Sequence, residues 1–162
     1  YNSRVYKLRR KLGIVFQDFK LLPKLTVYEN VAFGLENSGM RSKDIKKKVL
    51  IAIERVGLKE KLRSFPNQLS GGEQQRVCIA RAIVDEPKVL ICDEPTGNLD
   101  PKTSKEIVKV INKINKEMGT TVIMVTHDKE IVNSMKKRVI TLENGVLAGD
   151  TLKGSYTADE ND

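Results

Sequence analysis

Short apolar runs alternate with segments of helical character along this chain, and this alternation limits its fold more than any other feature. The runs at residues 12–16, 88–92 and 120–126 have the length and composition of strands buried on both faces of a sheet. Between them, apolar residues recur at helical spacing in residues 42–56, and Asp100 followed by proline forms a strong helix start. Strands that alternate with helices predict a parallel sheet covered by helices, so we expect an α/β fold.

One long stretch, residues 23–85, contains no convincing strand and is interpreted as a helical insertion into that core. Thr26 and Glu29 have the spacing of a capping box, in which each side chain bonds the other residue's backbone N–H. Ser42 is expected to cap the next helix, and Gly72 to begin a third. We therefore expect one domain with a helical part inserted in its sequence.

The composition is that of an ordinary globular domain, since 40% of the 162 residues are hydrophobic and 31% are charged. No apolar run approaches the roughly 20 residues that cross a bilayer, and the basic N-terminus has no signal-peptide pattern. We expect a cytosolic chain that meets a membrane only through a partner or its surface charge. Cys78 and Cys92 lie in apolar segments without metal-ligand spacing, so both are expected to be small buried hydrophobes.

The net charge of +8 is partly concentrated in clusters at residues 9–11, 46–48 and 136–138. Charge alone leaves three interpretations open: solvated faces that aid solubility, contact with anionic lipid headgroups, and contact with nucleic acid. The function therefore has to be argued from motifs.

Two acids, Asp93 and Glu94, directly follow the apolar run at residues 88–92. Ligands of open α/β sheets bind outside the carboxyl ends of the strands, which is where these carboxylates should lie. The pattern matches a Walker B strand, whose first acid helps to hold Mg²⁺ and whose second can polarise the water that attacks a γ-phosphate. It matches equally well a surface strand that ends in two solvated acids.

Residues 69–75, Leu-Ser-Gly-Gly-Glu-Gln-Gln, are more specific. Gly71 and Gly72 allow backbone N–H groups to approach a phosphate closely, and the Ser70 hydroxyl adds a donor. The helix that follows directs the positive end of its dipole at a bound anion. The segment therefore predicts phosphate binding.

Together these residues resemble the nucleotide-binding domain of ABC transporters. Residues 69–75 are similar to the complete signature motif of that family and precede the Walker B strand, as they do in the family. The resemblance implies that Gln17 is the Q-loop glutamine, which reaches Mg²⁺ and the attacking water. It also implies that Asp100 is the D-loop aspartate, which acts across a dimer. His127, the only histidine in the chain, resembles the switch histidine that contacts the γ-phosphate.

The same resemblance implies a fold and a set of roles. The fold is a P-loop NTPase (RecA-like) core with a parallel sheet, residues 1–22 and 86–162, and an ABC helical subdomain at residues 23–85. Two copies would enclose ATP and Mg²⁺ between them as a homodimer. The implied catalytic residues are Gln17, Glu94 and His127, and the implied Mg²⁺ ligands are Asp93 and Gln17. The implied nucleotide-binding residues are Ser70, Gly71, Gly72, Gln74 and Asp100.

Residues 15–23 and 26–33 closely resemble the Q-loop region of the FtsE family of cell-division ATP-binding proteins. This implies an ATP-hydrolysing subunit, peripheral on the inner face of the plasma membrane through an FtsX-like integral membrane subunit, with no direct contact with nucleic acid. ATPases of lipoprotein release and macrolide export share residues 95–100 and are one alternative. A soluble ABC ATPase that works on nucleic acid and a catalytically inactive scaffold are two others.

The phosphate loop of such proteins, Gly-x-x-x-x-Gly-Lys-Ser/Thr, has no counterpart here, because the 162 residues contain no Gly-Lys dipeptide. The family places that loop ahead of the strand that leads to Gln17. The chain is therefore interpreted as a fragment whose core lacks its N-terminal part, and we expect that it does not hydrolyse ATP by itself.

Overall fold

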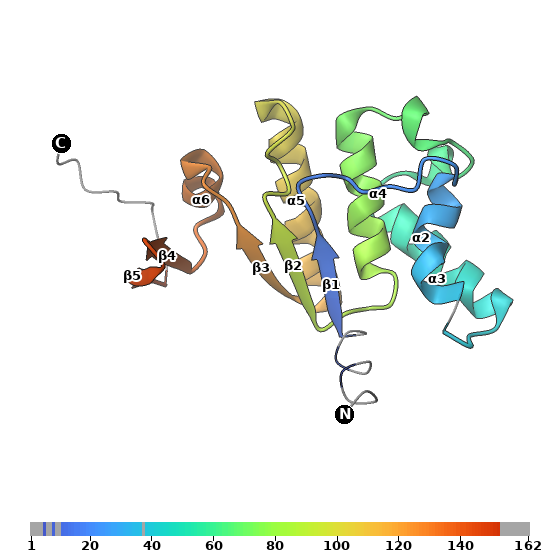
Figure 1. Ribbon diagram of the computed structural model, residues 1–162, viewed down its shortest axis with the longest axis horizontal. Helices are drawn as coiled ribbons and strands as arrows, with labels where there is room; N and C mark the ends of the chain where they lie inside the picture. Colours follow the sequence, from blue (N-terminus) through green and yellow to red (C-terminus); the bar gives the residue numbers. More distant parts are fainter. Residues whose placement is uncertain (1–4, 6–7, 9–10, 37, 153–162) are drawn as a thin grey trace. The chain divides into compact units, whose positions relative to one another are not determined.

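The computed structural model describes residues 5, 8, 11–36 and 38–152, so that Arg9 and Arg10 of the first basic cluster lie outside the described part. The chain forms two compact units, Tyr1–Val125 and Thr126–Asp162. Figure 1 follows the chain from the N-terminal strand through the helices to the C-terminal hairpin.

The first unit is built on a parallel sheet of three strands in the order β1-β2-β3. The strands are β1 (Leu12–Val15), β2 (Val89–Asp93) and β3 (Thr121–Val125). In the register, Ile91 of β2 lies between Ile14 of β1 and Ile123 of β3. All three expected strands are confirmed, and with them the α/β fold.

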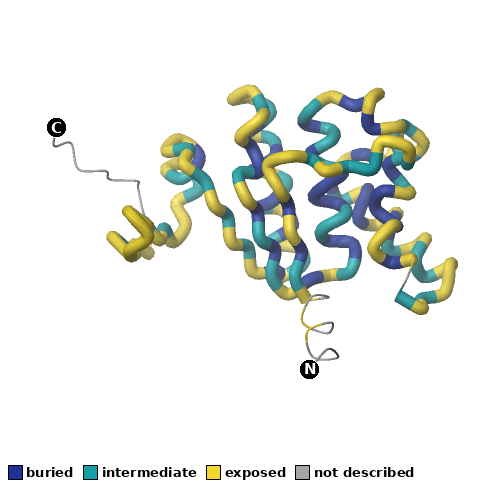
Figure 2. Tube along the Cα trace, in the orientation of Figure 1, coloured by how far each residue is buried: buried dark blue, intermediate teal, exposed yellow. Residues whose placement is uncertain are grey.

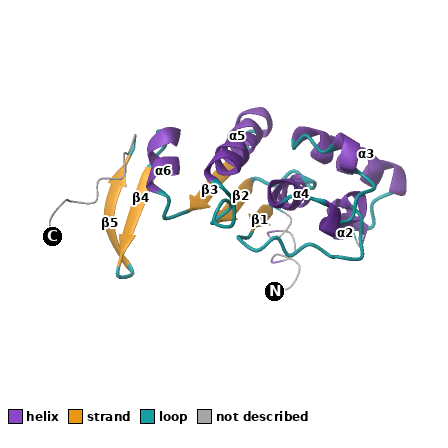
Figure 3. Ribbon diagram, turned by 90° about the horizontal axis from the view of Figure 1, so that it is seen from above, coloured by secondary structure: helices purple, strands orange, loops and turns teal. Residues whose placement is uncertain are grey.

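The helices of this unit lie on one face of the sheet and beyond it (Figures 1 and 3). Two of them contact strands: α4 (Gly71–Ile83) packs on β1, and α5 (Pro101–Met118) packs on β3. Two others, α2 (Val27–Glu36) and α3 (Ser42–Arg55), pack against α4. Helix α4 therefore stands between the sheet and the α2–α3 pair and contacts both. Among the described residues, no helix is long and apolar enough to cross a membrane.

Residues of different burial alternate along the strands of the sheet (Figure 2). On the face toward α4 and α5, Val15, Leu90 and Cys92 are fully buried. On the opposite face, Ile14 and Ile123 expose 46% and 51% of their surface. The core of this unit therefore lies between the sheet and the helices. The expectation that the strands are buried on both faces is wrong for β1 and β3, because no described helix of this unit covers Ile14 and Ile123 on the other face.

The helix ends agree with the sequence signals at most positions. Thr26 and Glu29 form the expected capping box at α2, with the Thr26 N–H donating to Glu29 Oε2 at 2.8 Å. Gly57 and Gly119 follow α3 and α5 with φ of 74° and 64°, the left-handed conformation that glycine adopts at helix ends.

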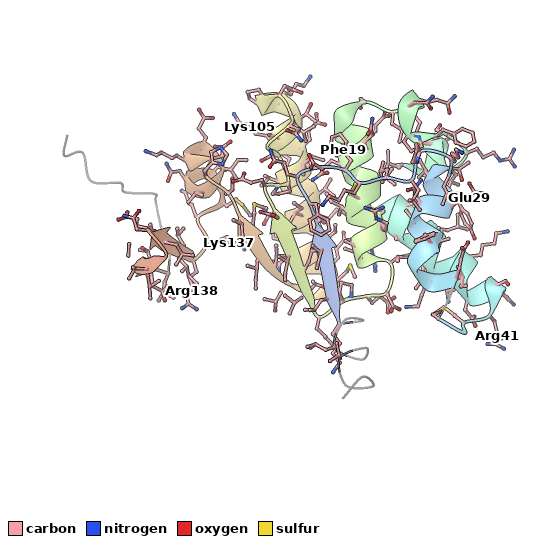
Figure 4. All side chains as sticks on the ribbon, viewed as in Figure 1. Phe19, Glu29, Arg41, Lys105, Lys137 and Arg138 are labelled. Atoms are coloured by element: carbon pink, nitrogen blue, oxygen red, sulfur yellow. The ribbon has the colours of Figure 1, made fainter. Side chains whose placement is uncertain are left out.

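The expected cap at Ser42 is wrong. The residue before α3 is Arg41, whose backbone is extended (φ −66°, ψ 141°) and whose side chain makes no cap hydrogen bond. Ser42 is already helical, so its hydroxyl lies one position too late to cap the helix. Arg41 instead bonds Asp44, in the first turn of α3, at 3.0 Å; Arg41 is labelled in Figure 4. Sequence reasoning also missed two short 3₁₀ helices, η1 (Lys59–Lys61) and η2 (Pro66–Gln68).

The second unit contains α6 (Lys129–Met135) and an antiparallel hairpin of β4 (Val139–Glu143) and β5 (Val146–Thr151). The hairpin was expected, with its turn at Asn144 and Gly145, and both residues have positive φ. Arg138 clamps Asp150 with two hydrogen bonds of 2.8 and 2.6 Å. This contact holds the pKa of the Asp150 carboxyl below its ordinary value.

A close approach of α4 to the sheet yields the first prediction. A Cβ added at Gly13 of β1 would collide with the Ala82 carbonyl of α4. We expect Gly13→Ala to lower the free energy of unfolding by about 1–3 kcal/mol, the usual cost of overpacking.

The matched control is Gly34→Ala on α2, where an added Cβ meets nothing within 4 Å. This change should raise the free energy of unfolding by about 0.5–1 kcal/mol, because alanine favours the helix. Urea denaturation of both variants measures the difference. Equal effects at Gly13 and Gly34 would contradict the close packing.

Candidate functional site

The carboxyl end of β2 carries the two acids that the sequence singled out. Asp93 is exposed at the last position of the strand, and Glu94 follows it in the left-handed conformation, with φ of 44°. The Glu94 N–H donates to the Val125 carbonyl at the end of β3, at 2.9 Å. Non-glycine residues with positive φ are uncommon and cluster at functional sites. The chain turns sharply here and leaves both carboxylates at the edge where open α/β sheets bind ligands.

Gln17 lies beside the loop that follows these acids. Its Nε2 donates to Asn98 Oδ1 at 3.4 Å, and the Asn98 amide donates to the Gln17 carbonyl at 3.3 Å. A Cβ at Gly97 would lie 2.8 Å from Gln17 Nε2, so the Gln17 side chain packs directly on the Gly97 backbone. The structure thus brings Gln17 together with the loop that begins at Glu94.

Helix α4 begins at a second capping box. The Glu73 N–H donates to Ser70 Oγ at 3.3 Å, and the Ser70 N–H donates to Glu73 Oε2 at 2.9 Å. The bond from the Ser70 backbone holds the pKa of Glu73 below its ordinary value, and the nearby Lys61 ammonium, at 3.4 Å, lowers it further. The first N–H groups of a helix lack partners within the helix. At this helix start, those of Gly71 and Gly72 are therefore suited to receive an anion.

The starts of α4 and α5 lie against each other. A Cβ at Gly72 would collide with the Thr103 side chain in the first turn of α5. Asp100 caps α5 by accepting from the Lys102 and Thr103 N–H groups at 3.1 and 3.0 Å. The Thr103 hydroxyl, which also donates to Asp100, is the main reason that the pKa of this carboxyl is lowered. The starts of two helices thus meet at one edge of the unit, and the Asp100 carboxylate already caps the start of α5.

The neighbouring glutamines of α4 have different surroundings. Gln74 Nε2 donates to the Leu69 carbonyl at 3.2 Å, at the start of its own helix. Gln75 is fully buried, and its Nε2 donates to the Pro95 carbonyl at 2.8 Å. Sequence reasoning named Gln74 and missed Gln75. The signal was available, because Gln75 shares an inward helix face with Gly72 and Ile79, at spacings of three and four.

His127 belongs to the second unit, two residues after the end of β3. The next residue, Asp128, caps α6 by accepting from the Ile131 N–H at 3.1 Å. The role of His127 at the γ-phosphate stays a prediction.

The two cysteines are free and buried, as expected. Burial raises the pKa of each thiol to about 12. Both therefore stay protonated at neutral pH.

Among the described residues, no cluster of three or more His, Cys, Asp or Glu side chains could hold a metal ion. The donors at the carboxyl end of β2 are the Asp93 and Glu94 carboxylates, and the Gln17 amide lies at the following loop. Mg²⁺ typically takes one or two protein carboxylates and fills its other positions with phosphate oxygens and water. The donor set therefore fits Mg²⁺ that arrives with a nucleotide, and it does not form a metal cage of its own.

Comparison with known proteins gives one family and close relatives. The family model described as ABC transporter matches residues 2–97. The cell division ATP-binding protein FtsE of Bacillus subtilis is 62% identical over 149 residues, which cover 92% of this chain and 65% of that protein. The chain thus spans slightly less than two thirds of this relative's length.

Two solved structures share the fold. The chain cbiO1 of Clostridium perfringens, part of the ABC transporter complex cbiONQ, matches with a TM-score of 0.88 and 37% identity; the match covers 94% of this chain and 61% of cbiO1. A dimeric, post-hydrolysis structure of the ATP-binding cassette MJ0796 with ADP and phosphate matches with a TM-score of 0.77 and 36% identity, over 96% of this chain and 69% of the cassette.

The lowered pKa of Glu73 yields a prediction about acid. A carboxylate whose pKa is lowered in the folded state stabilises it above its ordinary pKa, about 4.3, and loses this effect as the pH falls through the lowered value. Acid should therefore weaken the start of α4. Glu73→Gln keeps an acceptor for the capping box and removes the titration, so its thermal midpoint should fall less between neutral pH and about pH 3.

Glu60→Gln, at an exposed position of η1, is the control for loss of one negative charge. Thermal unfolding followed by circular dichroism at both pH values measures the effect. The same acid-induced drop in Glu73→Gln as in the parent chain would refute the prediction.

Proposed function

This chain belongs to the ABC transporter family, and we propose that it is part of an ATP-hydrolysing subunit that works with a membrane partner in cell division. The observation that carries the proposal is that one edge of the first unit carries both sets of residues that a nucleotide site shared between two copies needs. There the two glycines at the start of α4 lie against Leu99 and Thr103. Leu99 belongs to the loop that follows Glu94, and Asn98 of the same loop bonds Gln17.

The start of α4 is proposed to bind the γ-phosphate of ATP. Ser70 Oγ accepts the Glu73 N–H, which leaves its own proton to be donated to a phosphate oxygen. The N–H groups of Gly71 and Gly72 point along the helix axis toward the same place, and the helix dipole favours the anion. Gln74 would add its amide at the same helix start.

The other side of the site is proposed to contain the acids and Gln17. Asp93 and Gln17 would hold Mg²⁺, which neutralises charge that develops on the phosphate oxygens. Glu94 would orient the attacking water and take up its proton as the water oxygen bonds to the γ-phosphorus and ADP leaves. His127 would contact the γ-phosphate.

These two sides are proposed to belong to different copies of the chain. In a two-fold symmetric dimer each site would take Gln17, Asp93, Glu94 and His127 from one copy and Ser70, Gly71, Gly72, Gln74 and Asp100 from the other. The MJ0796 cassette, which has the same fold and is dimeric with ADP and phosphate bound, supports the dimer. ATP would hold the two copies together, and hydrolysis would release them.

The partner is proposed to be an integral membrane subunit of the FtsX type, which would hold the protein at the inner face of the plasma membrane. The 62% identity to a cell division protein supports this choice over lipoprotein-release or macrolide-export systems. Purification of the tagged protein from membranes should recover such a subunit. Salt-dependent binding to DNA or RNA, without a membrane partner, would instead favour the nucleic-acid alternative.

The absent phosphate loop yields a prediction about nucleotide binding. The 162 residues contain no Gly-Lys dipeptide, and so they lack the backbone cradle and the lysine that bind the β- and γ-phosphates. We expect this chain alone to bind a fluorescent ATP analogue with Mg²⁺ at least about 100-fold more weakly than a longer form that includes a phosphate loop, a loss of about 2.7 kcal/mol. Comparable binding by the two forms would contradict the proposed site.

The role of Glu94 yields a prediction about turnover. In the form with a phosphate loop, Glu94→Gln should lower kcat for ATP by about 100-fold or more while ATP still binds, because general-base catalysis contributes that much. Glu36→Gln, at the exposed end of α2, should leave kcat unchanged. Steady-state phosphate release measures both, and undiminished turnover in Glu94→Gln would exclude this residue as the base.

A further inference from the structure

Two side chains of α4 bond the backbone of the segment that follows β1. Arg81 donates from Nη1 to the Lys20 carbonyl at 2.8 Å and from Nη2 to the Phe19 carbonyl at 3.2 Å. The Cys78 thiol donates to the same Phe19 carbonyl at 2.8 Å. Figure 4 shows Phe19 beside α4. Three donor groups on two neighbouring side chains of one helix thus converge on two consecutive carbonyl groups.

The segment they hold has an unfavourable backbone. Lys20 has a φ of 45°, in the left-handed region that few non-glycine residues adopt. Its ammonium lies 4.3 Å from the centre of the Phe16 ring, a cation–π contact across the turn. Such a conformation persists when contacts from outside the segment hold it, and the guanidinium of Arg81 supplies them.

The same segment carries Gln17. Residues 17–20, which we call the Q-loop segment, are fixed at one end by Asn98 and at the other by Arg81 and Cys78. Loss of the second anchor would free the turn at Lys20 and let Gln17 move away from its place beside Gly97.

We propose that Arg81 is a positioning residue for catalysis: it holds the Phe19 and Lys20 carbonyls and through them sets the place of Gln17. The proposal rests on the proposed function for its catalytic consequence, although the contacts themselves do not depend on it. Since Ser70 caps the start of the same helix, α4 would connect a residue of one ATP site to Gln17 in the other site of the dimer.

Arginine is required by this geometry. The planar guanidinium donates to both carbonyls at once, whereas a lysine in its place has one ammonium on a flexible stem. Arg81→Lys keeps the charge and loses the paired contact. It should therefore hold the Q-loop segment less firmly than the parent chain and more firmly than Arg81→Ala.

Thiol labelling of this chain tests the anchor without any nucleotide. Cys78 and Cys92 are 2% and 0% exposed, so a thiol reagent reaches either only after opening. Arg81→Ala should raise the labelling rate of Cys78 relative to Cys92 by about tenfold or more, since a hydrogen bond to a charged group is worth at least that factor in an equilibrium constant. Cys92 lies in β2 and reports global unfolding in the same sample.

The control on the same helix is Arg76→Ala, which removes the 2.8 Å ion pair with Glu106 of α5 and leaves the Q-loop segment alone. In this variant the ratio of the Cys78 labelling rate to the Cys92 labelling rate should stay at the value of the parent chain. If Arg81→Ala does not fold, Arg81→Lys gives the same test with a smaller rise. An unchanged ratio in the folded Arg81 variants, or an equal rise in Arg76→Ala, overturns the proposal.

A double-mutant cycle tests the link to Gln17 in the form with a phosphate loop. Arg81→Ala and Gln17→Ala should each lower kcat more than they raise KM, and the double variant should lose no more than the larger single loss. Losses that multiply would mean that Arg81 does not act through Gln17. If no form hydrolyses ATP, the proposed function fails, and the thiol ratio still decides whether Arg81 holds the segment.

Discussion

The packing of α4 on the first strand is the constraint on which the rest of the first unit depends. The missing side chain of Gly13 lets the helix backbone approach β1, and buried Gln75 ties the helix to the Pro95 carbonyl in the loop after β2. With the helix fixed in this way, its two ends are fixed too. Ser70 and the glycines lie at its start, and Arg81 lies near its end, against the Q-loop segment. One helix therefore sets the position of three site segments.

Local signals predicted much of this architecture. The strands at residues 88–92 and 120–126 are apolar runs between breakers. Helix α5 is capped by Asp100 and Gly119, whose chemistry favours those positions. The error at Ser42 also has a local cause, because the helix begins one residue earlier than the serine signal implied. Arg41 is the N-cap residue, and Ser42 is the first helical residue. The N-cap residue is hard to predict when several polar residues precede a helix. Short 3₁₀ helices are missed for a different reason, because they are too short to show a periodic pattern of apolar residues.

The contacts that organise the candidate site were beyond local reasoning. Gln75 and Pro95 are 20 residues apart, and Arg81 and Lys20 are 61 apart. Nothing local in the sequence says that these groups meet. The two adjacent glutamines look alike in the sequence, but the helix turns Gln75 into the core and leaves Gln74 at its start. The contact between the α4 and α5 starts is equally non-local, and it is the start of α4, with the N–H groups of Gly71 and Gly72, that suits a phosphate.

Light scattering with and without ATP tests most directly the claim that Ser70 of one copy completes the nucleotide site of another. The sample is the form with a phosphate loop and Glu94→Gln, which should bind ATP without turning it over. With ATP and Mg²⁺ the mass should double. A further Ser70→Arg change at the start of α4 should return the mass to that of a single copy, because the larger arginine side chain fills the place of the phosphate. A mass that is doubled without ATP, or that is still doubled by ATP in the Ser70→Arg variant, would contradict the account.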